Sequence, residues 1–111
     1  MELEVYLDIT KLDDDFALVV SSHAEETIEF FNERGLDGNG DTWAGIVESI
    51  VRLEMPEMYD RFSLSPEADD LLVTCDDRQL LERLGQCIRR YVADETLMAE
   101  AIENGDPDWL E

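Results

Sequence analysis

Basic side chains are scarce in this sequence. Eight Lys and Arg stand against 29 Asp and Glu, which gives a formal net charge of −21 and a sequence pI near 4.1. A field of this sign repels phosphate backbones and anionic lipid and attracts cationic surfaces. We therefore expect no direct nucleic-acid binding and a basic partner. The alternative is that the acid only keeps the protein soluble, as in the acidic proteomes of salt-adapted organisms.

Residues that carry common enzyme chemistry are also few. His23 is the only histidine, so any catalytic Ser-His-Asp or Cys-His arrangement would have to include it. Cys75 and Cys87 have neither CxxC spacing nor a nearby histidine, which predicts buried free thiols. Nucleotide-binding glycine loops and the HExxH pattern are absent, and carboxylates are too abundant for any one pair to indicate a glycosidase. We expect no enzyme and no cofactor.

Long apolar runs are missing as well. No segment approaches the roughly 18 apolar residues that a membrane span needs, and the start Met-Glu-Leu-Glu lacks the basic region of a signal peptide. These features predict a cytoplasmic protein without a membrane partner. Hydrophobic residues still make up 44% of the 111 residues and occur along the whole chain. We therefore expect one folded domain over residues 1–111.

Alternating and helical patterns predict the elements. Leu3 to Ile9 alternates with period two, and Phe16 to Val20 follows an Asp13-Asp14-Asp15 turn, which indicates a hairpin. A second hairpin is predicted from 62–65 and 71–75, joined by 65–69. The order β-β-α-α-β-β-α-α favours an α+β fold, a four-stranded antiparallel sheet with helices packed on one face.

Four helices complete this order. The first is predicted to start at a Ser22–Glu25 capping box and to end at Gly35, and the second to run from Trp43 through Leu53 until Pro56. Trp43 heads an apolar stripe and is predicted to be core, whereas Trp109 could be exposed or fold back. The third helix is predicted to be capped by Asp76 and to bury Leu80, Leu84, Ile88 and Tyr91; the last carries Leu97, Ala101 and Ile102 before Gly105 and Pro107.

The segment Asp37 to Glu48 has the spacing of a calcium loop. Asp37, Asn39 and Asp41 occupy ligand positions one, three and five, and Glu48 falls at position twelve, where a bidentate carboxylate belongs. Position six is Thr42 where the sharp turn calls for glycine, which weakens the match. The alternative is a solvated turn in which Asp41 caps the next helix.

Two stretches resemble a known family. Gly35 to Ile50, GLDGNGDTWAGIVESI, is similar to the Gly-Asn-Gly, Trp, Gly signature of the Imm51 family of bacterial immunity proteins. Met55-Pro56-Glu57 and then Ser65-Pro66-Glu67-Ala68, before an apolar strand and a Leu-rich helix, agree in order over about residues 30–100. Of the matching positions, Gly38, Asn39, Gly40, Trp43 and Gly45 look structural. Asp41 and Asp69-Asp70 depart from the pattern.

The resemblance implies a non-enzymatic protein that binds and blocks a polymorphic toxin encoded beside it. A nuclease toxin would be basic, so the acidic charge would steer the two together. Within this interpretation the predicted toxin contacts are Asp13, Asp14, Asp15, Asp37, Asp41, Asp69 and Asp70. An acidic mimic of nucleic acid, occupying a basic groove of another protein, is a further alternative. We expect a monomer or a weak homodimer.

Overall fold

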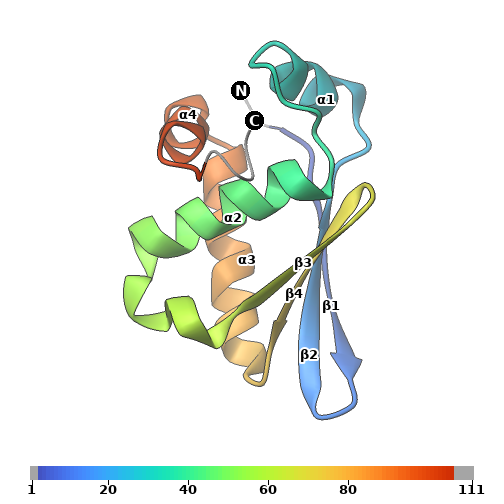
Figure 1. Cartoon of the computed structure of the whole chain (residues 1–111), viewed down its shortest axis with the longest axis vertical. Helices are drawn as coiled ribbons and strands as arrows, with labels where there is room; N and C mark the ends of the chain where they lie inside the picture. The colour runs from blue at the N-terminus through green and yellow to red at the C-terminus, as the bar shows by residue number, and fades with distance from the viewer. Residues whose placement is uncertain (1–2, 107–111) are drawn as a thin grey trace.

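The structure is a computed structural model that describes residues 3–106. Its elements follow the predicted order, with one 3-10 helix added after the second α-helix (Figure 1). The strands are β1 (Tyr6–Leu12), β2 (Asp15–Ser21), β3 (Ser63–Glu67) and β4 (Asp70–Cys75). The helices are α1 (Glu25–Asn32), α2 (Gly40–Glu54), η1 (Pro56–Arg61), α3 (Arg78–Val92) and α4 (Glu95–Glu103).

The four strands form one antiparallel sheet in the order β1-β2-β4-β3. Both predicted hairpins are present, and they meet at the centre of the sheet through β2 and β4. The first strand begins later than predicted because Leu3 pairs elsewhere: its N–H donates to the carbonyl of Val92 at 2.9 Å. The second turn is tighter than predicted, since β3 continues through Glu67 and only Ala68 and Asp69 connect it to β4.

The prediction that helices pack on one face is confirmed. In Figure 1, α2 and α3 lie across the same side of the sheet, and α4 packs on both of them. Register explains which side chains they cover: Leu18 lies opposite both Ile9 and Val73, and all three belong to or pack against the buried core. The neighbouring residues on each strand point to the other face, which no helix among residues 3–106 covers.

Trp43 is a core residue, as predicted. It is fully buried near the start of α2, and its indole ring meets the ring of Phe31 edge-on, with centroids 5.4 Å apart. The indole N–H donates to the Ser22 hydroxyl at 3.0 Å, so its polar atom is satisfied inside the core. Trp109 and Pro107 lie outside the described residues.

Several predicted helix ends are wrong, and each has a local cause. Ser22 does not cap α1: its hydroxyl is taken by Trp43, and the cap position is Ala24, whose side chain makes no capping bond. Asp77 rather than Asp76 caps α3, accepting from Gln79 and Leu80. Leu53 continues the apolar spacing predicted for the second helix but is 42% exposed, whereas Val51 is buried beside Ile50.

The first helix is also shorter than predicted. It ends at Asn32, and Gly35, with a φ of 75°, follows in the left-handed conformation that glycine accepts without strain. The end of α2 before Pro56 is as predicted.

Both cysteines are free, as predicted, although only one is fully buried. Cys75 is buried in the sheet and Cys87 is half-buried on α3, where burial raises the pKa of its thiol. No helix within residues 3–106 is long and apolar enough to cross a membrane.

A polar network joins the ends of α2 and α3. The Tyr91 hydroxyl donates to Oε2 of Glu54 at 2.7 Å, and Arg90 forms an ion pair with Oε1 of the same carboxylate. Hydrogen bonding to Arg90, followed by that to Tyr91, lowers the pKa of Glu54 below its ordinary 4.5. Burial, followed by the bond to Glu54, raises the pKa of Tyr91 to about 12.

Glu54 is therefore expected to make stability pH-dependent. Because its folded pKa is depressed, its contribution is complete above pH 4.5 and is lost as pH falls through the folded pKa. We expect Glu54→Gln to cost about 1 kcal/mol at pH 7 and to flatten the loss of stability below pH 4.5, measured by urea unfolding between pH 7 and 3. Glu57→Gln is the control, since Glu57 lies 3.9 Å from Arg83 at an exposed site. Equal acid sensitivity in the wild type and Glu54→Gln would contradict the assignment.

Candidate functional site

The loop before α2 lies against the β3–β4 turn. The Gly40 N–H donates to the carbonyl of Ala68 at 3.0 Å, and a Cβ built on Gly40 would lie 2.3 Å from the carbonyl oxygen of Asp70. This close approach requires glycine at position 40. It also brings two predicted pairs of acids to one end of the sheet. We call Asp37, Asp41, Asp69 and Asp70 the loop cluster.

The other three predicted acids lie elsewhere. Asp13 and Asp14 form the β1–β2 turn and Asp15 begins β2; all three are exposed, and we call them the hairpin cluster. In the register, Phe16 pairs with Cys75 at this end, whereas Ser21 pairs with Asp70 at the other. The two clusters are therefore separated by the length of β2, about 20 Å at roughly 3.3 Å per residue. Composition alone could not show this division.

Asn39 explains the local structure of the loop cluster. Its side-chain oxygen accepts from the N–H of Thr42 at 3.1 Å, so Asn39 caps α2 and the proposed cap by Asp41 is wrong. The Thr42 hydroxyl in turn accepts from the N–H of Gly38, a residue with a φ of 76°. Asp41 lies in the first turn of the helix, where a negative charge is favourable.

The alternative calcium loop does not form. Because α2 starts at Gly40, the segment from Asp41 to Glu48 is helical rather than wrapped around an ion. Glu48 is committed elsewhere: its side chain is 10% exposed and accepts from Arg52 at 2.7 Å and from the Tyr59 hydroxyl at 3.3 Å. Within residues 3–106 no group of three or more His, Cys, Asp or Glu is placed to hold a metal ion.

His23 lies on the surface beside the loop cluster. Its side chain is exposed, and its Nε2 lies 4.0 Å from Oδ1 of Asp70. This long contact between exposed groups is a weak surface interaction. It is not the arrangement of an activated nucleophile, which needs a base within hydrogen-bond reach of a hydroxyl or thiol.

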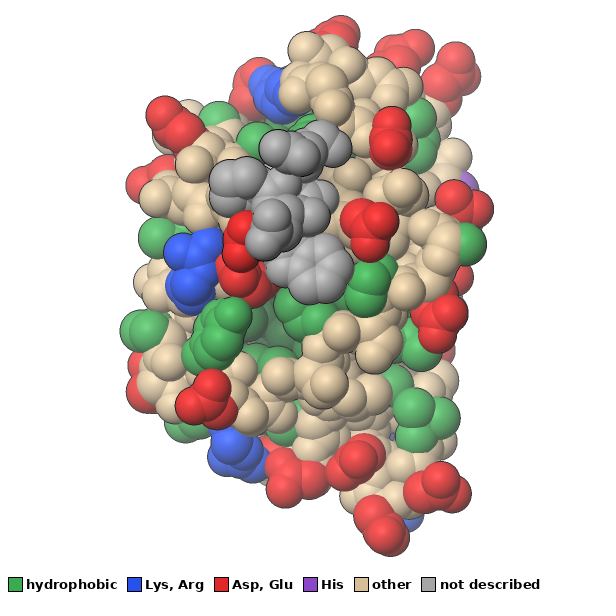
Figure 2. Space-filling view, in the orientation of Figure 1, with side chains coloured by type: hydrophobic (Ala, Val, Ile, Leu, Met, Phe, Trp, Pro, Cys, Tyr) green, Lys and Arg blue, Asp and Glu red, His purple; other side chains and the backbone are tan. Residues whose placement is uncertain are grey.

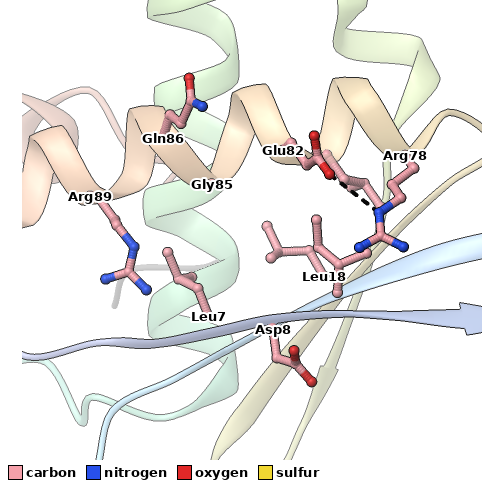
Figure 3. Close-up of a pocket in the computed structure, with 10 residues that line it drawn as sticks. Leu7, Asp8, Leu18, Arg78, Glu82, Gly85, Gln86 and Arg89 are labelled. Atoms are coloured by element: carbon pink, nitrogen blue, oxygen red, sulfur yellow. Dashed lines mark hydrogen bonds and ion pairs between the residues drawn. The ribbon is translucent and has the colours of Figure 1, made fainter.

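Sequence patterns did not indicate a groove between α3 and the edge strand β1. It has a volume of ≈ 360 Å³ and contains Leu7, Ile9 and Gly85, with Arg78 near one end and Arg89 near the other (Figure 3). Arg78 is paired with Glu82 at 3.2 Å. In Figure 3, Leu7 points from β1 toward α3, whereas Asp8 points to the opposite side. The period-two alternation of β1 in the sequence had indicated that Leu7 and Asp8 lie on opposite faces of the sheet.

The basic side chains are mostly paired within the chain. Six of the eight Lys and Arg residues lie within 4.0 Å of a carboxylate: Arg34, Arg52, Arg61, Arg78, Arg83 and Arg90. Since acids outnumber them more than threefold, a large negative surplus remains on the surface. Figure 2 shows it on one side of the molecule, where acidic side chains recur around the rim and basic ones are few.

The sequence profile of the Immunity protein 51 (Imm51) family matches residues 8–107, which is 100 of the 111 residues. The chain belongs to the Imm51 family. The match extends the resemblance seen in the sequence at both ends, from strand β1 to beyond α4. No significant match was found among curated proteins, and none among solved structures.

Imm51 membership supports an immunity role, and the structure explains the positions that carried the resemblance. Gly38 adopts a positive φ, Asn39 caps α2, Gly40 touches the β3–β4 turn and Trp43 fills the core. These four residues therefore shape the fold. Six of the seven acids in the two clusters are exposed, whereas Asp70 is half-buried.

Proposed function

We propose that this chain neutralises a cognate toxin domain with a basic surface by binding it in the cytoplasm, without catalysis. The observation that carries the proposal is the match to an immunity-protein family over most of a chain with a net charge of −21. Opposite charge accelerates encounter and selects the partner. The exposed acids of the loop cluster and the hairpin cluster are the proposed contacts.

Stoichiometric binding separates this function from an enzymatic one. The test titrates the chain against the toxin domain encoded beside it and measures the residual toxin activity. A binder protects with a break near equal concentrations, whereas an enzyme that modifies the toxin would protect at a small fraction of the toxin concentration. Growth rescue on co-expression is the companion assay. Absence of both rescue and binding would overturn the proposal.

Salt should weaken the complex mainly through its rate of formation. We expect the association rate constant to fall at least tenfold between 50 and 500 mM NaCl, because the Debye length shrinks from about 14 Å to about 4 Å. Replacing Asp13, Asp14 and Asp15 together by Asn should reduce this salt dependence, measured by stopped-flow association. Glu100→Asn combined with Glu103→Asn on α4 is a control that removes exposed charge from the helical side. An equal change in both variants would remove the special role of the hairpin cluster.

A further inference from the structure

The face of the sheet opposite α2 and α3 is open among the described residues. Its side chains follow from the register: Tyr6 lies beside Ser21, Asp8 beside Val19, and Thr10 beside Ala17. On the other side of β2, Ala17 lies beside Thr74 and Val19 beside Leu72. None of these residues belongs to the buried core cluster. Figure 3 agrees, since Asp8 points away from α3.

On the two central strands, β2 and β4, the middle of this face is uncharged and closely packed. Ala17 is only 1% exposed although no helix covers it, because Thr10 and Thr74 flank it on the adjacent strands. Val19 and Leu72 are half-buried next to it. An apolar, partly buried centre is the kind of surface that a partner can desolvate at little cost.

The ends of the same face are acidic. Alternation places Asp15 at one end of the open side and Glu67 and Asp70 at the other, and the turns add Asp13, Asp14 and Asp69. Asp8 lies between these ends, on the edge strand β1 beside Val19. Lys11 is the only basic residue in the four strands, and its register partner Phe16 belongs to the inner face. The open face therefore combines an apolar centre with negative charge at both ends.

We infer that this open face is where the toxin domain docks, with its basic side chains reaching the hairpin cluster at one end and Asp69 and Asp70 of the loop cluster at the other. The inference rests on the proposed function and adds the surface to it. It also gives the hairpin cluster and the Asp69–Asp70 pair one partner: both border the same face, although the length of β2 lies between them.

Size and charge decide between possible occupants. The four strands, of five to seven residues each, cover roughly 400 Å². A stable interface buries about 800 Å² on each partner, so the partner must extend over both turns. A second copy of this chain would place Asp8, Asp15, Glu67 and Asp70 against the same acids, which is unfavourable. A cationic toxin surface fits where a second copy does not.

One substitution made at two sites tests this inference. Leu72→Lys puts a positive charge at the centre of the open face, and Leu53→Lys makes the same chemical change on exposed α2, on the helical side. We expect Leu72→Lys to raise the Kd for the toxin domain at least tenfold and Leu53→Lys to change it less than threefold, measured by calorimetry. Tyr6→Lys, at a side chain that is 56% exposed, is the second face variant if Leu72→Lys does not fold.

The outcomes separate the surface from the function. Unchanged binding by both face variants, with the wild type still neutralising the toxin, would overturn the docking surface and leave the proposed function intact. No binding by the wild type would remove the proposed function as well. A homodimer of the wild type that Leu72→Lys dissociates, seen by light scattering, would assign the face to a second copy and overturn the inference.

Discussion

Replacing Trp43 by alanine is expected to lower the free energy of unfolding by about 4 kcal/mol, the range for a large buried aromatic residue. Trp43 is fully buried, its ring packs edge-on against Phe31, and its N–H satisfies the hydroxyl of Ser22. Alanine would leave a cavity between α1 and α2 and would leave a buried hydroxyl without its donor. Urea unfolding at pH 7 measures the loss.

A milder variant separates packing from hydrogen bonding. Trp43→Phe keeps an aromatic ring against Phe31 and removes the bond to Ser22, so we expect a smaller loss, about 2 kcal/mol. Leu53→Ala is the control at an exposed position in the same helix and should cost less than about 1 kcal/mol. A loss below about 1 kcal/mol for Trp43→Ala would contradict the core position of the indole.

Gly40→Ala is expected to cost about 3 kcal/mol through a backbone clash. The added Cβ would lie 2.3 Å from the carbonyl oxygen of Asp70 and 3.1 Å from the nitrogen of Glu67. Both neighbours are backbone atoms of the β3–β4 hairpin, so neither can rotate away. The start of α2 would have to move from the turn, which would also separate the acids of the loop cluster.

Gly85→Ala is the matched control for this clash. Gly85 lies within α3, and a Cβ built on it meets no atom within 4 Å. Alanine should therefore stabilise the helix there by up to about 1 kcal/mol, because glycine costs more backbone entropy. Thermal unfolding of the two variants should shift in opposite directions. A Gly40→Ala protein as stable as the wild type would show that the turn and the helix are not in tight contact.

Local patterns predicted most of the fold because they depend on neighbouring residues only. Alternation in β1 and β2 and the apolar stripes of α2 and α3 identified the elements and the buried faces. The helix caps were less predictable, since polar residues stand close together and compete. Asn39 is two residues from Asp41, Asp77 is next to Asp76, and Ser22 is engaged by a tryptophan 21 residues away.

The candidate site was predictable in its chemistry and not in its arrangement. Composition indicated acidic contacts, and Asp13–Asp15, Asp37, Asp41 and Asp69 are exposed, whereas Asp70 is half-buried. Their division between two ends of the sheet depends on the pairing of β2 with β4, which joins residues 49 to 59 positions apart. No local pattern contains that information, and the open face between the clusters depends on the same pairing. Contact of either cluster with a toxin stays a prediction.

The central pairing also sets the order in which the protein can fold. Each hairpin can close from contacts a few residues apart, but the sheet is complete only when Phe16 meets Cys75 and Ser21 meets Asp70. Closing such a long loop costs more entropy than a local turn, and sheets that need it fold more slowly than helical bundles. During synthesis, β2 cannot pair with β4 until β4 has left the ribosome. A new molecule therefore gains its complete open face only after Asp70–Cys75 has been made and released from the ribosome.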